Sequence, residues 1–195
     1  MKQTATFLLL IILFTSCVSS IHPLSENGLK DDRLPGHWMD SASRMEAWVS
    51  AAGSAENKDL HYSITVYEPN KDKDQYKDTS FLEGQLVKLD NEYFLDLSIA
   101  EDNPQSVNAG RTLMGFLLPQ HQFFKLHISE NSIALLYMDH DKLKRLVTGA
   151  TPHFELDKNT LVLTGTSGQL QAKMRSWAKY PGLFQQAYLF RKMKP

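Results

Sequence analysis

The 195-residue sequence contains a single cysteine, Cys17. One cysteine can form no internal disulfide bond, and metal sites built from pairs of cysteines are excluded as well. The sequence also lacks a surplus of charge, because 21 basic residues face 22 acidic ones and the formal net charge is -1. A protein that binds nucleic acid would carry a basic face, and a segment that binds anionic lipid would carry a basic cluster. We therefore expect no nucleic-acid partner.

No apolar run in the sequence is long enough to cross a membrane as a helix. The longest run, residues 7–14, has eight apolar residues and follows Lys2. Eight residues span about 12 Å as a helix, whereas the hydrocarbon core of a bilayer is about 30 Å thick. A short positive region followed by a short apolar run predicts a signal peptide rather than a membrane-spanning anchor.

Two small residues, Thr15 and Ser16, stand directly before Cys17. This pattern resembles the lipobox of bacterial lipoproteins, although Phe14 occupies a position where leucine is commonest. The resemblance implies that residues 1–16 are a lipoprotein signal peptide and that Cys17 is the lipidation site, carrying diacylglycerol and a further palmitate-type chain. At about 0.8 kcal/mol per buried methylene, such chains anchor a protein stably. The alternative is an ordinary secretory signal, cleaved near Ser20.

Residues 17–33 are polar, contain proline and glycine, and show no apolar periodicity. This composition is typical of a flexible tether. Val18 follows the cysteine where an aspartate would resemble an inner-membrane retention signal. The lipoprotein resemblance therefore implies a location at the bacterial outer membrane, with the side that the domain faces left open.

The remainder, residues 34–195, suits one domain. Apolar and polar residues alternate in a manner that predicts strands, with two hairpins that turn at Asp90-Asn91 and at Glu130-Asn131. The predicted strands are 60–68, 79–89, 92–99, 121–129, 132–138, 153–156, 160–164 and 187–193. Two short helices are predicted at 139–147 and at 167–180, the second opened by a capping box at Thr166 and Gln169.

These elements predict a mainly β fold: an antiparallel up-and-down barrel of about eight strands with two short helices. Closure of a barrel removes exposed strand edges. A β-sandwich is the alternative.

The stretch LPGHWMD at residues 34–40 resembles the Gly-x-Trp entrance of the lipocalin superfamily, with Gly36 and Trp38 at the two positions. The resemblance implies a lipocalin-like barrel in which the tryptophan fills the closed end beneath a basic side chain. Arg191, on the last predicted strand, is expected to be that side chain, within about 6 Å of the Trp38 ring and in a cation–π contact. Other stretches, among them YFLDL and LLYMDHDKL, resemble a loose group of small bacterial proteins, which implies a shared fold and no known activity.

The sequence offers little that resembles catalytic chemistry, and we expect no enzyme and no cofactor. His121 and His127 lie about 20 Å apart on one predicted strand, too far to bind one zinc ion, and are expected to face solvent. In the stretch MDHDK, Asp139 is explained as a helix cap. A hydrolase would be indicated only by His, Asp or Ser side chains gathered at one pocket, because the Gly-x-Ser-x-Gly motif is absent.

The candidate ligand or core residues are Gly36, Trp38, Phe94, Phe124, Leu126 and Arg191. Phe94 shares a strand face with Asp96, and that face could be either the lumen or the outside of the barrel. Two functions remain open: a lipid-anchored envelope module that binds a small apolar ligand in the lumen, or a structural or interaction lipoprotein with a solid core and a protein partner of unknown identity. A cavity of about 300–1,000 Å³ would favour the first.

Overall fold

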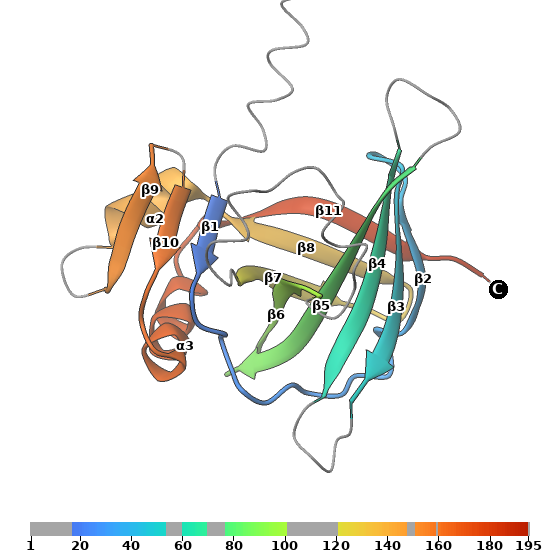
Figure 1. Ribbon diagram of the computed structural model, residues 1–195, viewed down its shortest axis with the longest axis horizontal. Coiled ribbons are helices and arrows are strands. Elements are labelled where there is room, and N and C mark those ends of the chain that lie inside the picture. The colour runs from blue at the N-terminus through green and yellow to red at the C-terminus, as the bar shows by residue number, and fades with distance from the viewer. Residues whose placement is uncertain are drawn as a thin grey trace, which may run out of the picture.

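The computed structural model describes residues 17–53, 60–69, 77–100, 121–147, 151–158 and 160–194. The predicted signal peptide lies outside the described residues. Strands dominate the described part of the chain, as the alternating sequence pattern predicts (Figure 1).

Eight antiparallel strands close into a barrel. In the order of the barrel they are β11 (Phe184–Lys192), β2 (Gly36–Asp40), β3 (Met45–Ala52), β4 (His61–Pro69), β5 (Lys77–Leu89), β6 (Glu92–Ile99), β7 (Gln122–Ile128) and β8 (Ser132–Met138). Strands β2 to β7 each pair with the next strand in the sequence, and β11 closes the barrel between β8 and β2. The predicted up-and-down barrel is thus confirmed, in place of the sandwich alternative.

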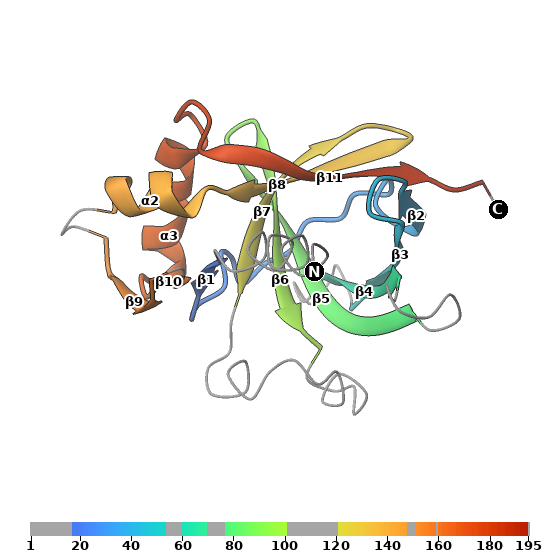
Figure 2. The same ribbon diagram turned by 90° about the horizontal axis from the view of Figure 1, so that it is seen from above.

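A smaller layer is inserted between β8 and β11. It contains α2 (His140–Leu146), β9 (His153–Asp157), β10 (Thr160–Leu163) and α3 (Ser167–Trp177). Strand β1 (Cys17–Ser20) adds to it in parallel with β10, giving a sheet of order β1-β10-β9. Figures 1 and 2 both show this layer at one end of the molecule and the C-terminus at the opposite end.

The alternation of side chains along the strands produces two separate cores. One core fills the barrel and includes Trp38, Tyr62, Leu86, Leu95 and Leu126. The other core lies between the outer face of the barrel and the smaller layer. There Leu170, Met174 and Trp177 of α3 pack with Val87 and Phe94 of the barrel.

Both predicted helices occur in the structure, and the predicted capping residues begin them. Asp139 caps α2 by accepting a hydrogen bond from the Lys142 N–H at 3.0 Å. Thr166 and Gln169 form the capping box of α3. The helix ends at Trp177, three residues before the predicted end.

Two strands of the barrel, β2 and β3, were not among the predicted strands, and two predicted strands, β9 and β10, lie outside the barrel. The expected number of barrel strands was therefore correct, but two of the strands assigned to the barrel were the wrong ones. The pairing of β2 with β11 joins residues more than 150 positions apart, such as Trp38 and Lys192. Local periodicity carries no information about a contact over that separation.

The prediction of a flexible tether at 17–33 does not agree with the structure, because this segment is packed against the barrel. Val18 is 8% exposed and Leu24 is fully buried. The Leu29 N–H donates to the Leu86 carbonyl at 2.8 Å, and the Asp31 N–H donates to the Tyr62 hydroxyl at 2.7 Å. Two apolar side chains and backbone bonds to distant strands hold a segment whose polar composition indicated a tether.

Candidate functional site

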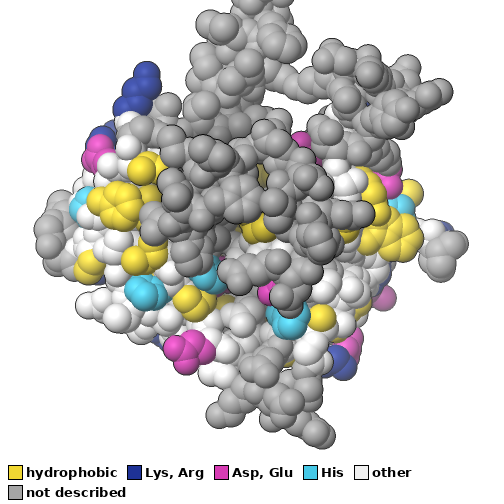
Figure 3. Space-filling model, in the orientation of Figure 1, with side chains coloured by type: hydrophobic (Ala, Val, Ile, Leu, Met, Phe, Trp, Pro, Cys, Tyr) yellow, Lys and Arg dark blue, Asp and Glu magenta, His cyan; other side chains and the backbone are white. Residues whose placement is uncertain are grey.

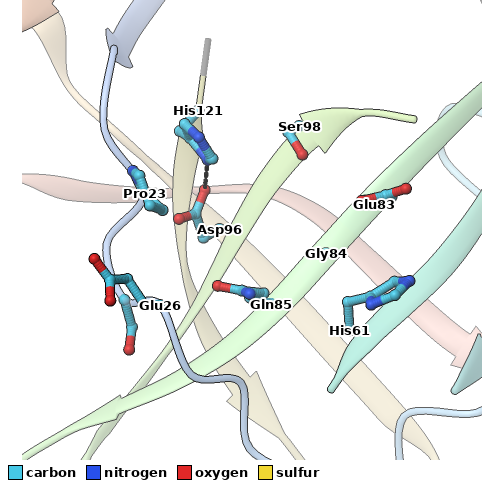
Figure 4. Close-up of a pocket in the computed structure, with 10 residues that line it drawn as sticks. Pro23, Glu26, His61, Glu83, Gly84, Gln85, Asp96, Ser98 and His121 are labelled. Atoms are coloured by element: carbon cyan, nitrogen blue, oxygen red, sulfur yellow. Dashed lines mark hydrogen bonds and ion pairs between the residues drawn. The ribbon is translucent and has the colours of Figure 1, made fainter. Parts of the chain in front are cut away.

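A polar cleft lies on the outer face of the barrel, beneath the N-terminal segment. Its volume is about 270 Å³. Pro23, Ser25 and Glu26 form one side, and residues of β4, β5 and β6 together with His121 form the other (Figure 4). We call this hollow the outer cleft.

The alternation of β5 and β6 brings the polar side chains of the outer cleft together. Glu83 and Gln85 alternate with the apolar Leu82 and Leu86 of the lumen, and on β6 the residues 94, 96 and 98 face outward. In the register of the two strands Gln85 lies opposite Asp96 and Glu83 lies opposite Ser98. Directly opposed side chains have Cβ atoms about 4.5–5.5 Å apart, so four polar groups share one small area.

Asp96 is the most buried of these groups, with its side chain 2% exposed. One carboxylate oxygen accepts the Leu24 N–H at 2.7 Å, and the other is 2.8 Å from His121 Nδ1. An ionised carboxylate can only accept hydrogen bonds, so Nδ1 of His121 carries the proton in this contact. The Ser20 and His121 backbones also exchange hydrogen bonds, both at 2.8 Å. Asp96 and His121 thus fasten the N-terminal segment to the barrel.

Gln85 adds an unsatisfied acceptor. Its Oε1 atom is buried and has no hydrogen-bond partner among the described residues. Figure 4 shows this oxygen pointing toward the space between Asp96 and Glu26. Buried polar atoms are nearly always paired in folded proteins. Gln85 Oε1 is therefore an unsatisfied acceptor that could receive a hydrogen bond from a donor outside the described residues.

The gathering of His, Asp and Ser at one pocket is the feature that would indicate a hydrolase. A serine nucleophile needs its base within about 2.6–3.2 Å. In the described part of the chain the Ser98 hydroxyl makes no hydrogen bond to His121. Ser98 and His121 therefore do not form a hydrogen-bonded serine–histidine pair in this structure.

The sequence prediction for the histidines was correct for His127 and wrong for His121. His127 is exposed, whereas the side chain of His121 is 20% exposed and paired with Asp96. The signal that was available in the sequence was that Asp96 and Ser98 share one face of their strand. No group of three or more His, Cys, Asp or Glu side chains that could hold a metal ion occurs among the described residues.

Three of the candidate residues, Trp38, Phe124 and Leu126, face the lumen of the barrel. Trp38 is 1% exposed, and its Nε1 donates to the Leu34 carbonyl at 2.8 Å. Leu126 belongs to the core of the barrel, and Phe124, two residues before it, shares its inward face. Phe94 is fully buried on the outer face against the smaller layer, which answers the question that its strand pattern left open.

The predicted contact between Arg191 and Trp38 was wrong. Arg191 is exposed, and Lys192 is the residue whose Nζ lies 5.1 Å from the centre of the Trp38 ring. Lys192 also donates to the Arg33 carbonyl at 3.2 Å. The inward set on β11 is Tyr188, Phe190 and Lys192, because the large aromatic rings fill the lumen and the smaller apolar side chains of the other set face outward.

Gly36 belongs to the same cluster. It has φ +141°, and a Cβ atom at this position would stand 2.9 Å from Lys192 Cε. Glycine permits both the backbone conformation and the close passage of the lysine.

Contacts outside the outer cleft also fix residues 29–33 of the N-terminal segment. The hydrogen bond from Arg33 lowers the pKa of Asp31. Burial raises the pKa of Tyr62, whose hydroxyl lies beneath the segment and donates to the Leu29 carbonyl at 3.2 Å. The contacts with Tyr62 hold residues 29–31 against strand β4.

A scan of protein families found no match to this chain, and searches of curated proteins and of solved structures found none either. None of the helices in the described ranges has the length and apolar character needed to cross a membrane. The fold and the site define the class: a closed eight-stranded antiparallel barrel with a helical side layer and a polar cleft on its outer face.

Proposed function

We propose that the protein is a non-enzymatic, lipid-anchored envelope lipoprotein with a solid barrel core, and that it acts by binding a protein partner. The single observation that carries this proposal is the filled lumen. Trp38, Tyr62, Leu86 and Leu126 are each at most 2% exposed inside the barrel. Two hollows among the described residues, of about 270 and 140 Å³, both lie outside the lumen. Sites for small apolar ligands are usually larger, at about 300–1,000 Å³, and mostly apolar.

The lipid anchor is proposed from the N-terminal sequence: Lys2, the apolar run 7–14 and the small residues before Cys17. The first strand of the structure begins at Cys17 and pairs at once with β10. An acylated Cys17 would therefore hold the smaller layer close to the bilayer, with no spacer between them. The outer membrane of a bacterium is the proposed location.

The surface for a partner is proposed at Trp48. This side chain is 52% exposed and stacks on the His37 ring, with centroids 4.2 Å apart and planes 11° from parallel. The His37 ring is in turn 3.3 Å from the Glu46 carboxylate. Tryptophans dominate the binding energy of many protein interfaces, and an indole held rigidly before binding loses little entropy on docking.

The barrel is also proposed to be lipocalin-like at its closed end. Gly36 and Trp38 hold the positions of the Gly-x-Trp motif, and Lys192 supplies the basic side chain over the indole. This arrangement supports the resemblance through a different residue from the one expected.

Native mass spectrometry of the protein, extracted gently from its own membrane, tests the core of the proposal. The expected mass is that of residues 17–195 plus acyl chains, with no further small molecule. A stoichiometric apolar ligand would favour the alternative function, binding in the lumen. A mature chain with unmodified Cys17 would contradict the lipid anchor.

A photo-crosslinking amino acid at position 48, introduced in the native bacterium, tests the partner surface. We expect one dominant crosslinked protein from position 48. The same amino acid at Leu156, which is 46% exposed on β9, is the matched control and should not capture that protein. Equal crosslinking from both positions would contradict the assignment of the surface.

A further inference from the structure

Two large apolar side chains are exposed on the outermost strand of the smaller layer. Phe154 is 38% exposed and Leu156 is 46% exposed. Both belong to β9, an edge strand of the sheet β1-β10-β9. Figure 3 shows hydrophobic side chains over the smaller layer, where Figure 1 draws β9 and α2. Proteins normally charge or cover an exposed apolar edge strand, because such an edge can pair with another chain.

The charges beside these two residues suit the headgroup layer of a membrane. Glu155, which stands between them in the sequence, is paired with Lys144 of α2, the carboxylate lying 2.8 Å from Nζ. Lys158, in the turn after β9, is exposed. A lysine can lay its apolar stem along an apolar surface and extend its ammonium group toward anionic headgroups. We call Phe154, Leu156 and Lys158 the β9 edge.

The register places the residue proposed to carry the lipid at the same end of the sheet. Cys17 lies opposite Thr160, so β1 and β10 begin together. Thr160 in turn lies opposite Asp157, the last residue of β9. Neighbouring strands lie about 4.8 Å apart, so the backbone of Cys17 is about 10 Å from the end of β9. Figure 1 shows the beginnings of β1 and β10 and the end of β9 together, at the top of the smaller layer.

An acylated Cys17 would bring the β9 edge to the surface of the bilayer. The acyl chains would hold the backbone of Cys17 at the headgroup layer, which is about 5–8 Å thick on each side of the hydrocarbon core. Apolar side chains of interfacial proteins enter this boundary by about 5–10 Å. A protein partner on β9 would need space between that strand and the bilayer, and β1 provides no spacer because it begins at Cys17.

We propose that the β9 edge is a membrane-contact surface, and that Phe154 and Leu156 enter the headgroup boundary of the bilayer that holds Cys17. The inference rests on the proposed lipid anchor and extends it from a tether to a fixed orientation of the domain. Trp48 pairs with His37, whose carbonyl accepts the Met193 N–H close to the C-terminus. The proposed partner surface thus lies at the end of the molecule away from the smaller layer, and faces away from the bilayer (Figures 1 and 2).

The test uses the full chain, purified from its own membrane and reconstituted into vesicles. The vesicles contain phosphatidylethanolamine, phosphatidylglycerol and a phosphatidylcholine with brominated acyl chains. A fluorescent amino acid whose emission depends on its environment replaces Phe154 or Leu156. Met193, which is 37% exposed near the C-terminus, is the matched control position. We expect a blue shift and quenching by bromine at 154 and 156, and neither effect at 193.

A charge in the contact surface should abolish the effect. With the fluorescent residue at position 154, Leu156→Asp should remove the quenching, because a carboxylate resists transfer out of water. Met193→Asp introduces the same charge at the other end of the molecule and should leave the quenching unchanged. Circular dichroism checks that both variants are folded, and the comparison of positions 156 and 193 decides the matter without either variant.

Emission at 154 and 156 that matches the emission at 193 would overturn the proposal. A blue shift without quenching by bromine would overturn it too, because a protein or a second copy of the chain would then cover β9.

Failure of the lipid anchor is detected separately, by the mass of the purified chain. If Cys17 carries no acyl chains, a phospholipid with a maleimide headgroup is coupled to it, since it is the only cysteine in the chain. Quenching at 156 in the chain tethered in this way would still support the contact surface, and its absence would overturn it.

Discussion

Replacing Lys192 with methionine removes the charge above Trp38 while keeping an unbranched apolar side chain over the ring. The Nζ lies 5.1 Å from the centre of the indole and donates to the Arg33 carbonyl at 3.2 Å. A cation–π contact contributes about 0.5–2 kcal/mol, and a hydrogen bond from a charged group about 1.5–3 kcal/mol. Because Lys192 is only half-buried and the carbonyl can turn to water, we expect a loss of about 2 kcal/mol in the free energy of unfolding.

The assay is urea denaturation followed by circular dichroism. With a slope of about 1–3 kcal/mol per molar urea, the midpoint should fall by about 1 M. Arg191→Met is the matched control, since Arg191 is adjacent, basic and exposed. A surface substitution of this kind changes stability by at most about 0.5 kcal/mol. If the two variants lose the same stability, the assignment of Lys192 as the inward basic residue is refuted.

Three further predictions concern stability. Burial acts to raise the pKa of Asp40, but hydrogen bonds from Ser43 and from a backbone N–H outweigh it and the pKa lies below its usual 3.8. A depressed folded-state pKa stabilises the protein above the unfolded-state pKa, and this stability is lost as the pH falls below about 4. Asp40→Asn should therefore lower stability at pH 7 and flatten the dependence of unfolding free energy on pH between about 4 and 2; an unchanged acid limb in urea titrations would contradict this. Gly36→Ala should lower the free energy of unfolding by about 1–3 kcal/mol because of its positive φ. Gly168→Ala, in helix α3 with no atom within 4 Å of an added Cβ, is the control and should be neutral or stabilising. Equal effects of the two substitutions in thermal denaturation would refute the strain at Gly36. Phe94→Ala should cost about 3–5 kcal/mol, as for a fully buried phenylalanine, and a cost below 1 kcal/mol in urea denaturation would contradict its place in the core.

Local patterns were sufficient for much of the fold. The hairpins that turn at Asp90 and at Glu130 were predicted because both of their strands lie within about ten residues of the turn. Helix α3 was predicted from its capping box and its apolar stripe, which are also local. In such elements the stabilising interactions lie within a few neighbouring residues. The same residues form the sequence pattern, so the pattern is enough to predict the element.

The outer cleft was not predicted, because its parts meet only in the folded chain. Leu24 and Asp96, which fasten one side of it to the other, are 72 positions apart. The sequence showed Asp96 and Ser98 on one face and did not determine whether that face was inside or outside. The smaller layer determines the direction of this face. Phe94 is buried against α3 outside the barrel, so residues 96 and 98 of the same strand face outward too.

The sequence by itself determined the kind of fold, the hairpin turns and the helix caps, because strand alternation and capping depend on neighbouring residues. Only the tertiary structure decided which strands form the barrel, that residues 17–33 are packed, and which basic residue of β11 covers Trp38. On β11 a bulge between Gln186 and Tyr188 shifts the alternation, and the lumen takes the face with the larger rings. A one-residue shift moves every following side chain to the opposite face of the sheet, so the choice between Arg191 and Lys192 depends on how the whole barrel is filled.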